Sequence, residues 1–133
     1  MEDAAHKETA LTRRVQLAQE RSTYLSNISL DDLLKKELFP TWEDYPPKKA
    51  KEGCQEIIRS LILALHGEEK PLSVAFVTQK LKECVEQLNQ FDRKQKKFIE
   101  TVERENLCEV LEEVACAAKC PSLVEKIDEW KDW

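Results

Sequence analysis

The sequence predicts an all-α protein, a compact bundle of five or six helices in one domain over residues 1–133. Apolar residues recur at three- and four-residue intervals along most of the chain, the spacing of helices with one buried face. No stretch alternates apolar and polar residues for long enough to form a strand. The chain has only 2 glycines and 5 prolines, and turn-rich β folds need more of both. A chain of this length can form a core without metals or disulfides.

The first predicted helix covers about residues 5–26. Its apolar stripe is thin, because two of its members are small: Leu11, Val15, Ala18, Ser22 and Leu25. Residues 1–28 are therefore expected to form an N-terminal helical extension of the single domain. Three alternatives stay open for this extension, namely that it packs on the body, that it is mobile, or that it takes part in self-association.

Capping signals place the second and third helices. Ser29 and Asp32 have the spacing of a capping box, and Pro40 is expected to end the second helix because the residue before a proline avoids the α region. A third helix is predicted over about 46–66, with Gly67 as a left-handed cap. Its inner face is Ala50, Cys54, Ile57, Ile58, Leu61, Ile62 and Leu65.

Three more helices complete the prediction. Ser73 caps the fourth, whose stripe is Val77, Leu81, Cys84, Val85, Leu88 and Phe91. The fifth is expected over about 96–119, with an inner face of Phe98, Ile99, Val102, Asn106, Val110, Leu111, Val114 and Ala118. Pro121 introduces a last short helix that places Leu123, Ile127 and Trp130 inward.

Charge and composition exclude several functions. The formal net charge of −5 argues against a nucleic-acid partner, which requires a concentrated basic surface. The longest apolar run, residues 61–65, is far too short to span a membrane. The first residues lack the apolar core of a signal peptide, and 5 cysteines, an odd number, suit a reducing compartment. These features predict a cytoplasmic protein.

The cysteines near the end of the chain are the candidates for metal or redox chemistry. Cys116 and Cys120 are four residues apart and would share one helix face, with Cys108 roughly on the same side. A tetrahedral zinc site needs four ligands, usually in closely paired spacings, and these cysteines lack that pairing. We therefore interpret them mainly as small buried residues, with Cys120 as the thiol expected to be exposed.

Carboxylates and aromatic residues are the candidates for partner binding. Glu105, Glu109 and Glu112 fall on one helix face, and a surface of one sign attracts an oppositely charged protein. The ordinary alternative is a solvated face. Tryptophan and tyrosine are frequent in interfaces, and packing of a terminal helix is their alternative role. The aromatic candidates are Trp42, Tyr45, Trp130 and Trp133.

The segment "YPPKKAKEGCQEII" at 45–58, read with the ending Asp132-Trp133, resembles a bacterial family of small acidic helical proteins of unknown function. That family opens a helix with a Tyr-Pro-Lys motif and has Arg-Asp-Trp near its end. The segment "KPLSVAFVTQKLKECVEQLNQ" is similar to a Lys-Pro helix of the same family. The resemblance covers about residues 38–133. It implies an all-α domain and carries no activity.

Together these observations predict a non-catalytic, intracellular protein-interaction module. No catalytic or phosphate-binding motif is present in the sequence, and we expect no cofactor. One form of the prediction is an inhibitor- or immunity-like protein whose acidic helix face meets a basic partner. The alternative is a small-molecule- or metal-binding bundle that uses Cys116 and Cys120. Monomer and homodimer both stay open, and neither nucleic acid nor membrane is an expected partner.

Overall fold

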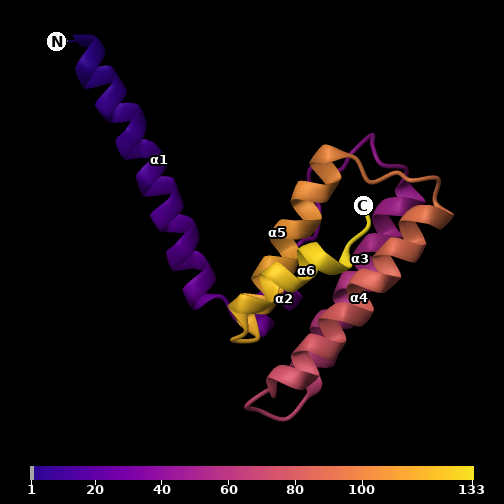
Figure 1. Ribbon diagram of the computed structural model, residues 1–133. Helices are drawn as coiled ribbons and strands as arrows, with labels where there is room; N and C mark the ends of the chain where they lie inside the picture. Colours follow the sequence, from indigo (N-terminus) through magenta and orange to yellow (C-terminus); the bar gives the residue numbers. More distant parts are fainter. Residues whose placement is uncertain (1) are drawn as a thin grey trace.

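The computed structural model describes the backbone of residues 2–133 and the side chains of residues 10–133. Within these residues the chain forms six α-helices and one 3-10 turn, with no strand, so the all-α prediction is confirmed (Figure 1). Side chains of residues 2–9, in the predicted N-terminal extension, lie outside the described set. The helices are α1 (Glu2–Asn27), α2 (Leu30–Lys35), α3 (Lys48–Gly67), α4 (Val74–Lys94), α5 (Thr101–Ala117) and α6 (Val124–Trp130), with the 3-10 turn η1 at Pro121–Leu123.

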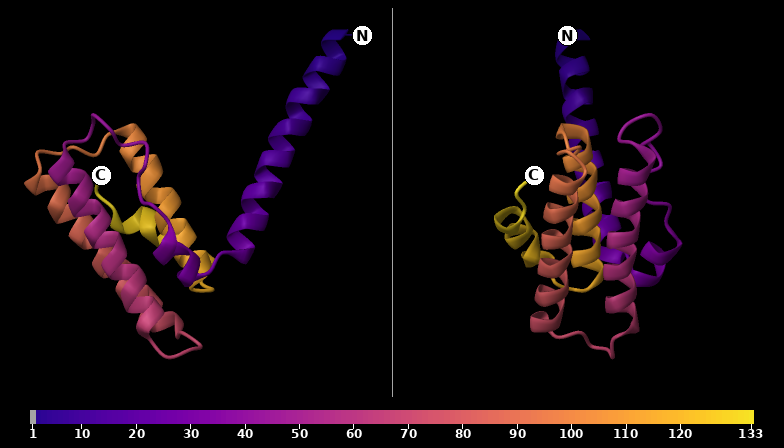
Figure 2. Two further views of the ribbon diagram at one scale, coloured as in Figure 1. Left: turned by 180° about the vertical axis from the view of Figure 1, so that it is seen from behind. Right: turned by 90° about the vertical axis from the view of Figure 1, so that its right-hand side faces the viewer.

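The body of the protein is built from α2 to α6. Helices α3 and α4 form an antiparallel hairpin, and they lie side by side in both views of Figure 2. Helix α5 packs against α4, and the short α6 contacts both α4 and α5. Helix α2 lies against α3 and α5 at the end of the body where α5 finishes.

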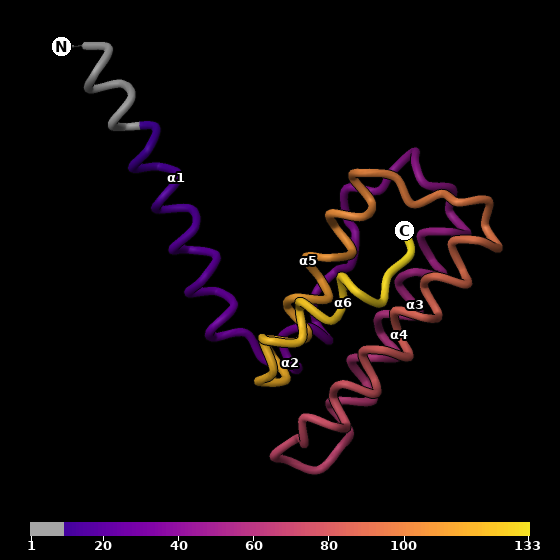
Figure 3. Tube along the Cα trace, in the orientation of Figure 1, coloured from indigo at the N-terminus to yellow at the C-terminus, as the bar shows by residue number. Residues whose placement is uncertain are grey.

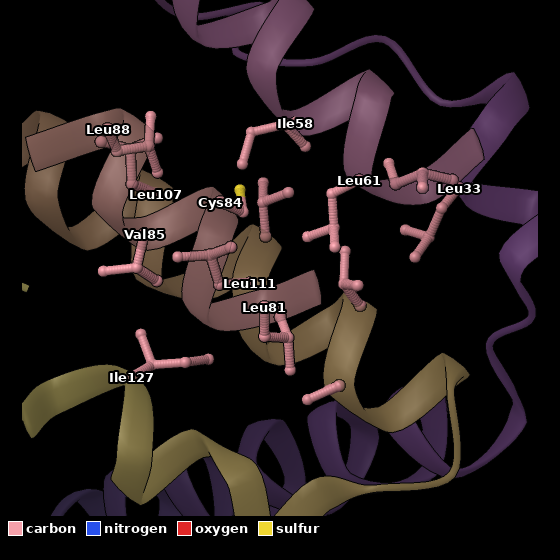
Figure 4. Close-up of a cluster of buried hydrophobic side chains, with 14 of the residues drawn as sticks. Leu33, Ile58, Leu61, Leu81, Cys84, Val85, Leu88, Leu107, Leu111 and Ile127 are labelled. Carbon is pink, nitrogen blue, oxygen red and sulfur yellow. The ribbon is translucent and has the colours of Figure 1, made fainter. Parts of the chain in front are cut away.

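The predicted apolar stripes meet in a single core. Figure 4 shows how α3, α4 and α5 direct Ile58, Leu81 and Leu111 toward one another, while Leu33 and Ile127 close the cluster from α2 and α6. Each of these side chains is at most 3% exposed. Cys84 lies among them, as the stripe of the fourth helix predicted. All five cysteines are free, so no disulfide joins these helices.

Two of the predicted helix starts are confirmed in detail. The backbone N–H of Asp32 donates to Ser29 Oγ at 3.0 Å, and the Asp32 carboxylate accepts from the Ser29 N–H at 3.1 Å, which completes the capping box. These hydrogen bonds lower the pKa of the Asp32 carboxyl. At the start of α4, Ser73 Oγ accepts from the Phe76 N–H at 3.1 Å.

The predicted end of α3 is wrong in its mechanism. Gly67 does not adopt the left-handed conformation and is the last residue of the helix. The free carbonyls are satisfied instead by Lys70, whose Nζ donates to the Leu65, His66 and Glu68 carbonyl oxygens at 2.8, 3.1 and 2.7 Å. An ammonium group also interacts favourably with the negative end of the helix dipole.

Two other boundaries differ from the prediction. Helix α2 ends at Lys35 rather than at Pro40, because Phe39 takes a left-handed φ of 56° and stacks on Trp42 at 4.1 Å between ring centroids. Helix α5 begins at Thr101 rather than near 96, since Lys96 and Lys97 both have positive φ. The turn before α5 is fixed by the buried Asp92, which accepts the Ile99 N–H at 2.9 Å.

Helix α1 leaves the body. Only its last turns contact α5, and the rest projects away at an open angle, as the coloured tube of Figure 3 shows. Residues 10–20 are all exposed, including Leu11, Val15 and Leu17 at 56–59%. Among the helices that the structure describes, none has the length and apolar content to cross a bilayer.

Candidate functional site

The junction between α1 and α5 is held by one arginine. Arg21 Nη2 donates to Glu112 Oε1 at 2.9 Å and to the Glu109 carbonyl oxygen at 3.4 Å, and Nη1 donates to Glu113 Oε2 at 3.3 Å. Desolvation opposes the charged form of this guanidinium, but the bonds to Glu112 and Glu113 outweigh it and raise the pKa of Arg21. The face of α5 that carries these glutamates therefore lies toward α1.

Glu113 is the buried centre of the same junction. Its side chain is only 3% exposed, and its Oε1 accepts from Lys36 Nζ at 2.6 Å and from the Tyr24 hydroxyl at 3.3 Å. Although desolvation alone would lower it, the bond to Glu113 raises the pKa of Lys36. The carboxylate thus joins α1, α2 and α5, and its burial is possible because charged donors surround it.

Above the junction the facing surfaces of α1 and α5 separate. We call residues 10–20 of α1 the arm, and the exposed side chains Val102, Glu105 and Glu109 the acidic face of α5. At about 3.6 residues per turn, Arg14 and Leu17 lie on the same side of α1 as Arg21, and Glu105 lies on the same side of α5 as Glu109. The arm and the acidic face therefore look toward each other across an open fork (Figure 1).

The fork has complementary charge on its two sides. Within the described residues, Glu105 and Glu109 form no ion pair, and Arg13 and Arg14 have no acidic partner. Val102, predicted to face inward, is 59% exposed and adds an apolar residue to the acidic face. The prediction of an exposed stripe is thus correct for Glu105 and Glu109, whereas Arg21 already occupies Glu112.

A groove continues the fork down to the junction. It has a volume of about 460 Å³ and lies between the last turns of α1 and the end of α5. By helical spacing, its α1 lining continues the arm's stripe of Leu11, Val15 and Ala18. The groove is lined by Ser22, Leu25, Ser26, Cys116, Lys119 and Pro121.

The aromatic candidates do not form one surface. Trp42 is 2% exposed, and its Nε1 donates to Asn106 Oδ1 at 2.8 Å, while Trp133 is 8% exposed and its carbonyl oxygen accepts from Arg104 at 3.1 Å. Burial removes both tryptophans from any surface that a partner could touch. Their role as partner contacts is therefore corrected to packing of the loop and of the chain end against α5.

The other two aromatics keep some exposure. Tyr45 is 45% exposed and donates its hydroxyl to the Phe98 carbonyl at 2.7 Å, which secures the loop before α3. Trp130 is half-buried, and its carbonyl oxygen accepts from Asn89 Nδ2 at 3.0 Å. Neither residue lies on the α1–α5 fork, and we assign neither to a partner.

The structure separates the cysteines that the sequence grouped. Helix α5 ends at Ala117 and Lys119 has a φ of 64°, so Cys120 does not share a helix face with Cys116. Cys120 is buried, which corrects its expected exposure, and burial raises the pKa of its thiol. Cys108 contacts Lys131 Nζ at 3.8 Å instead. No three His, Cys, Asp or Glu side chains among the described residues are arranged to hold a metal.

A second hollow, of about 440 Å³, lies at the end of the body between α2, the α3–α4 connection and the end of α5. Half of its lining residues are polar or charged, and His66 lies 3.6 Å from Asp31 at its rim. None of the cysteines lines it. The hollow is lined by Ser29, Leu30, Asp31, His66, Lys70, Pro71, Leu72, Ala117, Ala118 and Lys119.

Comparison with known proteins returned no matching family model, no matching curated protein and no matching solved structure. The site thus has to be understood from its own residues. Three of these were missed in the sequence: Arg21, Lys36 and Glu113. Glu113 carried a usable signal, since it lies three residues after Val110, and a carboxylate at that spacing shares the buried face of the helix.

Proposed function

We propose that this chain is a non-catalytic protein-interaction module that binds a helical segment in the α1–α5 fork. The observation that carries the proposal is the exposure of two facing surfaces, an arm with apolar side chains and two arginines, and an acidic face whose glutamates form no ion pair among the described residues. A bound segment would have to be amphipathic, with apolar residues against the arm and basic residues against Glu105 and Glu109. We place the module in the cytoplasm, where its free cysteines would stay reduced.

The exposed apolar area supports this reading. Leu11, Val15 and Leu17 occupy one 7-residue stretch and are each more than half exposed. Leu11 and Val15 are four residues apart and share one face of α1, whereas Leu17 lies on the side that carries Arg14 and Arg21, and exposed apolar side chains on a helix that has left its own body are available to a partner. The acidic face supplies orientation and a faster approach of a basic partner. An inhibitor-like role, in which a basic target is covered, is one form of this function.

The proposal can be tested with a synthetic helical peptide of leucine and lysine, labelled for fluorescence anisotropy. We expect the full chain to bind this peptide, and a leucine–glutamate peptide of the same length to bind at least about tenfold more weakly. Glu105→Gln with Glu109→Gln should weaken binding about three- to tenfold, since each exposed charge contact contributes under 1 kcal/mol.

A matched control removes two charges elsewhere. Glu125 and Glu129 are exposed on α6, also four residues apart, and their double glutamine variant changes net charge by the same amount. Equal weakening by the α6 and α5 variants would show attraction by net charge alone and would contradict a site in the fork.

A further inference from the structure

We propose that the segment which occupies the fork is α1 of a second copy of this chain, so that the protein is a homodimer joined by reciprocal exchange of arms. This inference rests on the proposed function, because it names the partner of that same site. In the dimer the two α1 helices lie antiparallel, and each arm enters the fork of the other copy with its N-terminal end first.

The chemistry of the arm matches what the fork requires. The acidic face calls for a helix with basic and apolar side chains, and the arm carries both: Arg13 and Arg14 precede its one acid, Glu20, and Leu11, Val15 and Leu17 are exposed. Thr12, Gln16 and Gln19 are polar and uncharged and line one shallow hollow on α1 together with Leu11 and Val15. A single chain therefore carries both halves of one complementary contact, yet the open angle between α1 and α5 keeps them apart within the same copy (Figure 1).

The contact also continues an interface that already exists. Within one chain Arg21 pairs with Glu112 and Glu113, and it is the last of the arginines along α1. In the dimer, Arg13 and Arg14 of the second copy would place the same group beside Glu109 and Glu105, one and two turns further along the same face of α5. The acidic face would then be neutralised along its whole exposed length.

Symmetry and length fit this arrangement. A two-fold axis makes the contact isologous, so that both copies use the same arm and the same acidic face and the assembly closes as a dimer. Helix α1 has 26 residues and α5 has 17, about 39 and 26 Å, so the arm together with the rest of α1 is long enough to lie along the whole of α5 of the other copy. The midpoint of Glu2–Asn27 lies between Arg14 and Val15, which puts four arginines near the centre of an arm pair.

The arginines near the centre of the arm pair make dimer formation dependent on the acidic face of α5. Two arms alone would bring like charges together, which is unfavourable, and the glutamates of both acidic faces offset this repulsion. Association should therefore depend on α5 as well as on α1. A simple pair of α1 helices would not show this dependence.

The test is sedimentation velocity of the full chain and its variants. We expect the wild type to be a dimer, and Val15→Asp with Leu17→Asp, at exposed positions, to give a folded monomer with unchanged helical circular dichroism. The charge reversals Arg13→Glu/Arg14→Glu and Glu105→Lys/Glu109→Lys should each weaken association at least about tenfold. An equimolar mixture of the two reversed chains should recover a heterodimer.

The outcomes separate this inference from the proposed function. A wild type that stays monomeric, or a dimer unaffected by Glu105→Lys/Glu109→Lys, would overturn arm exchange. The control Glu125→Lys/Glu129→Lys must leave the dimer intact, and its dissociation would also overturn the inference. If the wild type is a monomer and still binds the leucine–lysine peptide through Glu105 and Glu109, the proposed function stands without arm exchange. If the wild type is a monomer and does not bind the peptide, both the proposed function and arm exchange are wrong.

Discussion

Gly53 allows α3 and α4 to approach closely, and its replacement gives a sharp test of the packing. A Cβ at this position would lie 2.1 Å from Cζ of Phe91 and 2.6 Å from its Cε2, so the ring has to move. Phe91 cannot move freely, because its ring packs edge-on against Phe98 at 5.7 Å between centroids. Gly53→Ala should therefore destabilise the protein, although alanine is the better helix former.

The magnitude follows from three opposing contributions. Alanine in place of a mid-helix glycine stabilises a helix by about 1 kcal/mol. Overpacking costs about 1–3 kcal/mol, and loss of the Phe91–Phe98 pair costs up to about 1.5 kcal/mol. The clash outweighs the propensity, and we expect the free energy of unfolding to fall by about 1–2 kcal/mol.

Urea denaturation monitored by circular dichroism measures this change, with the slope m expected to stay constant. Gly67→Ala is the matched control, because nothing lies within 4 Å of its added Cβ, and it should stabilise by about 0.5 kcal/mol. In a Phe91→Ala background the clash is absent, so Gly53→Ala should then become stabilising by about 1 kcal/mol. A Gly53→Ala protein as stable as Gly67→Ala would refute the packing of α3 on α4 described above.

Other predictions concern charge, thiols and pH. Glu113→Ala leaves the partly buried Lys36 without its carboxylate, and we expect a loss of about 2 kcal/mol in urea denaturation; a change below about 0.5 kcal/mol would contradict the central role of Glu113. Iodoacetamide should modify the half-buried Cys116 in the native protein and reach Cys54 and Cys84 only after unfolding, since burial raises the pKa of both thiols to about 12; mass spectrometry of the labelled peptides reads the order. Because the pKa of Lys36 is raised in the folded protein, its contribution to the free energy of unfolding is complete below its ordinary pKa of 10.5 and is lost as the pH rises through its pKa in the folded state. The difference in stability between the wild type and Lys36→Met should therefore shrink in that alkaline range. An equal difference at pH 8 and in that range would argue against the Lys36–Glu113 pair.

The sequence was sufficient to predict those features that depend only on residues close together in the chain. Ser29 and Ser73 cap their helices as their spacing predicts, because an N-cap depends only on residues within one turn. The apolar stripes of α3 and α4 also reach the core as predicted. In these elements helix propensity, apolar periodicity and capping residues all indicate the same helix, so the sequence alone predicts it.

The errors occur where a side-chain contact outside the helical pattern overrides a local preference. Phe39 stacks on Trp42 only three residues away, but the sequence does not show that Asn106, 64 positions further along in α5, holds the indole in place for that stack. The start of α5 is likewise set by the carboxylate of Asp92 at the end of α4, which accepts the Ile99 N–H. Helical periodicity continues through both places and cannot reveal the interruption.

The candidate site was predictable only in part for the same reason. Glu105 and Glu109 could be recognised as exposed acids from their spacing alone. The pairing of Glu112 with Arg21 joins residues 91 positions apart, and no pattern in the sequence connects them. Trp42 and Trp133 were predicted to contact a partner and are buried instead, since the apolar area that favours tryptophan in interfaces also favours it in a core.

The separation of the arm from the body has a consequence for how this protein can change over evolutionary time. Residues 10–20 hold no position in the core, which is completed by α2 to α6 and by Ile28. A substitution on the arm therefore removes no buried contact and leaves the stability of the body nearly unaltered. Selection can act on what the arm binds independently of selection on the fold, so that related chains could keep one body and diverge in partner.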